Sequence, residues 1–147
     1  MRKTLCAVVA LAASATLSPA INAQTDMENT YASWPTYSGD DLELVVDNTG
    51  THFALWSPQA DAVKVYIYNT DRNSAPVATL IMKKAESGLW RVSVPEKLYG
   101  KFYTFAVTVG GKELAETPGV WAKAVGTNGH RAAIIDFADT DPDGWAG

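Results

Sequence analysis

A succession of short strand signals, separated by turn residues, is the feature that most constrains the fold of this chain. Between residues 62 and 68, apolar Val63, Val65 and Ile67 alternate with more polar positions, which is the period of a half-buried strand. Further strand signals cover residues 42–46, 51–56, 77–82, 90–94, 102–109, 112–116 and 132–137. Such a series predicts an all-β sandwich of about seven or eight antiparallel strands.

The residues between these segments support the same fold. Gly110-Gly111 separates two strand signals and suits a two-residue hairpin turn with positive φ. Residues 47–50 form a turn cluster. The strand signal over residues 51–56 ends before Pro58, because proline has no backbone N–H to donate. The Lys83–Gly88 segment is predicted to be a polar turn, and residues 117–131 form a longer loop. We expect no helix after residue 23.

The first 23 residues are predicted to be a signal peptide. Arg2 and Lys3 precede an apolar run over residues 5–17, and small residues end at Ala23. That run is shorter than the ~20 residues a membrane-spanning helix needs. We therefore expect an exported protein of a bacterium, either periplasmic, cell-surface or secreted. Residues 24–38 are predicted to be a flexible lead-in, residues 39–138 the sandwich, and residues 139–147 the start of a linker to a missing catalytic domain.

Charge and cysteine content narrow the classes of partner. Removing residues 1–23 takes away two of the 12 basic residues and none of the 16 acidic ones, so the net charge changes from −4 to −6. This balance argues against nucleic acid or an anionic membrane as a partner. The only cysteine, Cys6, lies in the predicted signal, so the mature chain has no disulfide and we expect a monomer held together by its core.

No catalytic residue, metal site or cofactor is predicted. Asp40 and Asp41 are adjacent, so their side chains should diverge, and Glu113 and Glu116 should point to opposite faces of a strand. The two histidines are far apart in the sequence, which argues against zinc. Residues 139–144 (DTDPDG) open like a calcium loop, but its glutamate at loop position 12 would fall beyond residue 147. An acidic turn at a module boundary is the better interpretation.

Aromatic side chains are the candidates for binding sugar, because pyranose rings stack on exposed rings. Trp56 and Trp90 alternate with polar residues in strand signals, so both are predicted to lie in the core more readily than on a binding platform. Trp121 lies in the long loop near Lys123 and Asn128, where an aromatic ring, a cation and an amide could meet one ligand. The predicted site for carbohydrate or domain docking comprises Trp121, Lys123, Asn128, Arg131 and Trp90.

Several motifs in this order resemble the N-terminal module of type I pullulanases. Residues 37–42 (YSGDDL), 53–58 (FALWSP), 62–65 (AVKV), 88–90 (GLW) and 98–105 (LYGKFYTF) carry the likeness. The most specific stretch, residues 122–131 (AKAVGTNGHR), looks like the family's "YAKAVGVNGKR" segment, and Asp136, Thr140, Pro142, Gly144 and Trp145 match its ending. One departure is Gly119-Val120-Trp121, where the family usually has Asp-Pro-Tyr.

This resemblance implies an Ig-like, family-48-type carbohydrate-binding module that precedes the catalytic barrel of an α-amylase-superfamily enzyme. The full-length enzyme would hydrolyse α-1,6 links in pullulan, starch or glycogen. The module would dock on the barrel and help to hold α-glucan, and no catalytic residue can be carried over to this chain. Two alternatives stay open: a free secreted α-glucan-binding protein, and a purely structural Ig-like domain.

Overall fold

A computed structural model of the chain describes residues 31–140, and the chain divides into two units, residues 1–34 and 35–147. In the first unit, the rings of Tyr31 and Trp34 meet edge to face, with centroids 4.8 Å apart. The second unit contains every strand found in residues 31–140. The predicted signal peptide and the calcium-like motif beyond residue 140 lie outside the described residues.

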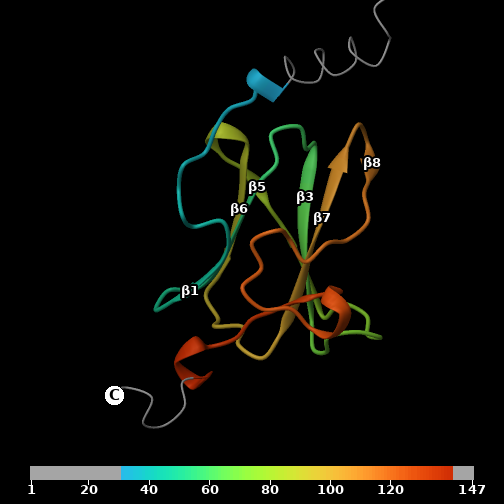
Figure 1. The fold of residues 1–147 in the computed structure, drawn as a ribbon. Coiled ribbons are helices and arrows are strands. Elements are labelled where there is room, and N and C mark those ends of the chain that lie inside the picture. Colours follow the sequence, from blue (N-terminus) through green and yellow to red (C-terminus); the bar gives the residue numbers. More distant parts are fainter. Residues whose placement is uncertain (1–30, 141–147) are drawn as a thin grey trace, which may run out of the picture. The chain divides into compact units, whose positions relative to one another are not determined.

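Two antiparallel sheets form the second unit (Figure 1). The first sheet has the order β1 (Glu43–Asp47), β2 (Gly50–Trp56), β6 (Leu89–Val94) and β5 (Lys83–Lys84). The second has the order β4 (Ala78–Ile81), β3 (Ala62–Tyr68), β7 (Phe102–Val109) and β8 (Lys112–Glu113), and β9 (Ala132–Ala133) pairs with β7. The second unit also has three 3₁₀ turns: η1 (Glu86–Gly88), η2 (Thr127–Gly129) and η3 (Phe137–Thr140). Residues 31–32 of the first unit are helical, so the expectation of no helix after residue 23 is wrong. The predicted all-β, Ig-like sandwich is confirmed.

The core follows from the alternation seen in the sequence. Val63, Val65 and Ile67 are all buried, as their period of two predicts. From the facing sheet, Phe53 meets the rings of Tyr103 and Phe105 edge to face, at centroid distances of 5.2 and 6.4 Å. Edge-to-face packing places the positive ring edge on the negative face, which stabilises aromatic clusters. This cluster joins the two sheets.

The chain crosses between the sheets at Met82, which the sequence did not predict. Residues 77–82 look like one strand, but β4 belongs to the second sheet and β5 to the first. Met82 lies between them, is buried, and donates its N–H to the carbonyl of Val63 at 3.0 Å. The predicted polar turn at residues 83–88 therefore contains β5 and η1.

Other predicted elements are shorter than expected. The Gly110-Gly111 turn joins β7 to β8 with φ values of 59° and 75°, as a two-residue hairpin of this kind requires. However, β8 ends at Glu113, and β9 covers only residues 132–133 of the predicted 132–137 strand. Ile134 continues that segment as a buried residue, bonded through its backbone to Gly100 and Lys101.

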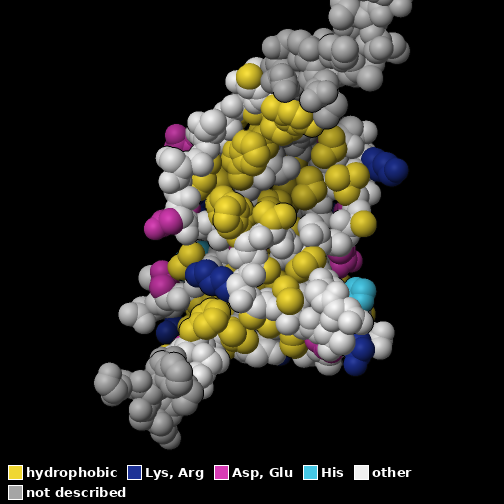
Figure 2. All heavy atoms as spheres, viewed as in Figure 1, with side chains coloured by type: hydrophobic (Ala, Val, Ile, Leu, Met, Phe, Trp, Pro, Cys, Tyr) yellow, Lys and Arg dark blue, Asp and Glu magenta, His cyan; other side chains and the backbone are white. Residues whose placement is uncertain are grey.

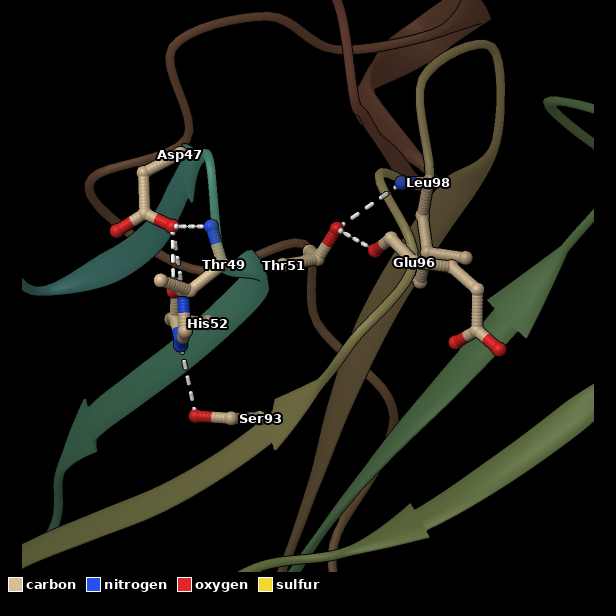
Figure 3. A network of polar contacts seen from close by, with 7 residues as sticks. All are labelled: Asp47, Thr49, Thr51, His52, Ser93, Glu96 and Leu98. Carbon is tan, nitrogen blue, oxygen red and sulfur yellow. Dashed lines mark hydrogen bonds and ion pairs between the residues drawn. The ribbon is translucent and has the colours of Figure 1, made fainter.

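A polar network holds the β1–β2 turn and the β6–β7 connection (Figure 3). The Asp47 carboxylate accepts hydrogen bonds from the backbone N–H and the hydroxyl of Thr49, at 2.7 and 2.6 Å. These bonds, with a further one to His52, lower the pKa of Asp47 to about 2. The buried hydroxyl of Thr51 donates to the carbonyl of Glu96 and accepts from the N–H of Leu98. The network thus fixes one end of the first sheet.

The predicted long loop, residues 117–131, is irregular and joins the two sheets. At its start, Thr117 exchanges both backbone hydrogen bonds with Phe105 of β7, at 2.7 and 3.0 Å. Four residues later, the N–H of Trp121 donates to the Glu43 side chain at the start of β1, at 2.7 Å. Because the loop is bonded to the second sheet at Thr117 and to the first sheet at Trp121, it presents the side chains of residues 117–121 from a defined position.

Candidate binding surface

One hollow of the described surface lies where this loop passes the start of β1. It is a groove of ≈ 330 Å³, which we call the tryptophan groove. Its lining is mostly apolar and includes Tyr37, Leu42, Leu55, Trp56, Val120 and Trp121. Figure 2 shows hydrophobic side chains gathered on the face that contains the loop. Val120 is 89% exposed and Trp121 65% exposed, so two consecutive apolar side chains beside this groove face solvent.

A hydrogen-bonded triangle holds the first wall of the tryptophan groove. The Arg91 guanidinium donates to the Asp41 carboxylate at 2.6 Å and to the Tyr37 hydroxyl at 3.1 Å. The Tyr37 hydroxyl itself donates to Asp41. The bonds from Arg91 and then from Tyr37 lower the pKa of Asp41, so its charge is retained in acid better than that of a free aspartate. Tyr37 is thereby tied to β6.

Glu43 holds the opposite wall. Its side chain is buried, its Oε1 accepts the N–H of Trp121, and its Oε2 is buried with no hydrogen-bond partner. Burial raises the pKa of this carboxyl. Its backbone has φ 70°, a left-handed conformation that is uncommon for residues other than glycine. At Gly119, a Cβ would stand 2.0 Å from Oε1, so the carboxylate fits only against a glycine.

The sandwich does not bring the five predicted site residues together. Trp121 lies on the rim of the tryptophan groove. Trp90 is buried in the core, as its alternation predicted, and its indole N–H donates to the Ser57 carbonyl at 3.0 Å. Trp56 differs from the core prediction: it is half-buried and lines the groove.

Lys123 lines a separate groove of ≈ 240 Å³ beside residues 44–46 of β1. We call it the Phe137 groove; Val45, Tyr99, Asp136 and Phe137 also line it.

Asn128 and Arg131 both take part in holding the fold rather than lining either groove. Asn128 adopts φ 58° and Gly129 φ 66°, which makes the tight turn that the sequence predicted. The Arg131 guanidinium lies 3.4 Å from the centroid of the Tyr68 ring. It also donates to the Thr70 carbonyl and to the hydroxyl and carbonyl of Ser74. Arg131 therefore fixes the η2 turn to the loop after β3, and both of its terminal guanidinium nitrogens donate within the fold.

The prediction that Glu113 and Glu116 point to opposite faces is wrong. Glu113 bonds Lys64 at 2.7 Å, and Glu116 accepts from Tyr68 and from Thr104. Lys64 and Tyr68 are four residues apart in β3 and share its outer face, so both carboxylates lie over that face. The reason is that β8 ends at Glu113, after which strand alternation no longer applies.

In residues 31–140, no group of three or more His, Cys, Asp or Glu side chains is arranged to hold a metal ion. In the same residues, no helix has the length and hydropathy that a membrane span requires.

A β-sandwich with apolar and aromatic grooves on its described surface has an architecture that suits a binding module. Within that class, residues 36–123 match the model of carbohydrate-binding module 48, the isoamylase N-terminal domain. This chain belongs to that family. The family likeness read from the motifs is confirmed.

Its relatives are pullulanases. The pullulanase of Klebsiella aerogenes is 29% identical over 107 residues, covering 68% of this chain and 10% of the relative. The solved pullulanase of Paenibacillus barengoltzii, in complex with maltohexaose and α-cyclodextrin, matches with a TM-score of 0.73 and 40% identity. That match covers 79% of this chain and 18% of the larger one. The chain thus spans about a tenth of the curated relative's length.

Several residues of this surface were missed in the sequence. Glu43 lies in the predicted strand segment 42–46 and was not singled out, and Tyr37 lies in the predicted lead-in. Tyr99 and Phe137 were not singled out either. One signal in the sequence could have drawn attention to Glu43. It is a charged residue between two leucines, Leu42 and Leu44, within an otherwise apolar segment.

Proposed function

We propose that this chain is the non-catalytic accessory module of an exported, pullulanase-type enzyme that debranches α-glucan. In this proposal the module docks on the catalytic domain of the enzyme through the tryptophan groove. Export is supported by the basic and apolar segments of residues 1–23. The debranching activity is supported by the relatives, which are named pullulanases and are far longer than this chain.

The exposure of Val120 and Trp121 beside an apolar groove carries the docking proposal. Contiguous exposed apolar surface on a soluble domain marks an interaction site, and tryptophan is enriched among the residues that dominate interface energies. Both walls are fixed before any partner arrives, one by Asp41 and Arg91 and the other by Glu43. A pre-formed surface loses less conformational entropy on association.

A second candidate is α-glucan bound in the same groove. Three aromatic side chains line it, Tyr37, Trp56 and Trp121, and sugar rings stack on such surfaces. The Paenibacillus pullulanase solved with maltohexaose shows that a relative binds this ligand class. The groove offers few polar groups for hydroxyls, however, so domain docking is the better fit.

Replacing Trp121 with alanine in two proteins separates these candidates. One is the module alone and the other is the module joined to a pullulanase catalytic domain. Docking predicts a lower melting temperature of the joined protein and an unchanged melting temperature of the module alone. Loss of maltooligosaccharide binding by the module alone would instead favour the sugar. If neither property changes, the proposed role of the groove is wrong. The matched control is Ile81→Ala, an exposed apolar residue of β4.

A further inference from the structure

The Phe137 groove combines aromatic and polar side chains in a way that the tryptophan groove does not. Phe137 is 50% exposed at the start of η3, and Tyr99 is half-buried beside it. Lys123 and Asp136 line the same hollow of ≈ 240 Å³. Ligand sites typically have this make-up, an apolar or aromatic lining with a few polar groups that fix orientation.

The polar groups of the Phe137 groove have unused hydrogen-bonding capacity. Among residues 31–140, the Lys123 ammonium, which carries three donors, makes no hydrogen bond or ion pair. The Tyr99 hydroxyl likewise has no protein partner in that part of the chain. Asp136 accepts one bond, from the N–H of Ala138 to Oδ1 at 3.1 Å, which leaves Oδ2 open. Two donors and one acceptor therefore face a hollow lined by two aromatic rings.

A hexose unit matches this combination. Its C–H face is apolar and stacks on an aromatic ring, while its rim of hydroxyls both donates and accepts hydrogen bonds. A nucleic acid would require a basic surface, and this chain has a net charge of −4. An apolar protein segment would leave the charged Lys123 and Asp136 desolvated and unpaired, which is costly.

We propose that the Phe137 groove is a carbohydrate subsite that takes a glucosyl unit of an α-glucan. Tyr99 and Phe137 stack on the sugar ring, Lys123 donates to its hydroxyls, and Asp136 accepts from one. The choice of α-glucan as ligand rests on the proposed function. Both grooves are lined by residues of β1 and of the same loop segment, since Trp121 and Lys123 are two residues apart. A glucan held here therefore lies beside the docking surface.

Titration of the purified protein with maltoheptaose tests this subsite. Phe137→Ala should weaken binding about tenfold. The variant lacks the exposed ring that the sugar would cover, so the apolar contact between the two is lost. Lys123→Gln should weaken binding by a smaller factor, and the control Ile81→Ala should leave it unchanged. Melting temperatures of the three variants should equal that of the wild type, since the replaced side chains are exposed.

Two outcomes would overturn the subsite: no binding of maltoheptaose to the wild-type chain, or wild-type affinity in Phe137→Ala. Loss of binding in Trp121→Ala with full binding in Phe137→Ala would place the sugar in the tryptophan groove and also overturn it. The docking proposal is tested separately, by the melting temperature of the joined protein. Maltoheptaose binding can therefore be intact in a module that does not dock, and the two failures can be told apart.

Discussion

The buried Oε1 of Glu43 accepts the backbone N–H of Trp121 at 2.7 Å, across 78 residues of sequence. This bond joins the edge strand of one sheet to a loop that leaves the other sheet at Thr117. It sets where the exposed Trp121 ring stands on the rim of the groove. Glu43 maintains this position in spite of a left-handed backbone and a second carboxylate oxygen that is buried without a partner.

Because of Glu43, the stability of the protein should fall as pH rises above the ordinary pKa of glutamate and through the raised pKa of this carboxyl. Burial raises the pKa of its carboxyl in the folded state, so folding favours the protonated form, and this contribution is lost as pH rises above the unfolded pKa. The carboxyls with lowered pKa values, Asp41 and Asp47 among them, contribute the opposite slope only in more acidic solution.

Glu43→Gln should remove this dependence while retaining an oxygen that accepts the Trp121 N–H. Urea unfolding at pH 5 and pH 8 measures it: the variant should lose less stability than the wild type and be the more stable of the two at pH 8. The control is Glu86→Gln, an exposed acid in η1, which should keep the wild-type slope. A wild-type slope in Glu43→Gln would contradict the assignment.

Arg131→Lys should destabilise the fold by about 1–3 kcal/mol. Lysine keeps the charge, but it has no planar fork to reach Thr70 and Ser74 together while lying over the Tyr68 ring. Chemical denaturation measures the change. Arg72→Lys is the control, since Arg72 is exposed and lies 4.0 Å from its only ion-pair partner in the described residues, Asp71. Equal stabilities of the two variants would show that Arg131 is a surface cation only.

The purified chain should release no reducing sugar from pullulan. Hydrolysis of a glycosidic bond requires two carboxyl groups that face one cleft and are free to act. In residues 31–140 the paired candidates are engaged, Glu113 by Lys64 and Glu116 by Tyr68 and Thr104. A reducing-sugar assay against a mock preparation measures this, and activity above the mock would refute it.

The sequence predicted those parts of the structure that depend on local pattern. Alternation placed Val65 and Trp90 in the core, and two adjacent glycines predicted the β7–β8 turn. It could not predict the change of sheet at Met82, because an apolar run has the same period on either side of a crossing. The grooves could not be predicted either, since they depend on contacts between residues far apart in the sequence, such as Glu43 and Trp121. Nearness in sequence suggested one site for Lys123 and Arg131, which the fold separates.

Hydrogen–deuterium exchange, compared between the module alone and the module joined to a catalytic domain, tests the docking claim most directly. Amides of residues 36–43 and 119–122, which border the tryptophan groove, should exchange more slowly in the joined protein because docking excludes water from them. Amides of residues 110–113, in the exposed β7–β8 hairpin, should exchange at the same rate in both. Equal exchange at the groove in the two proteins would contradict docking through Trp121.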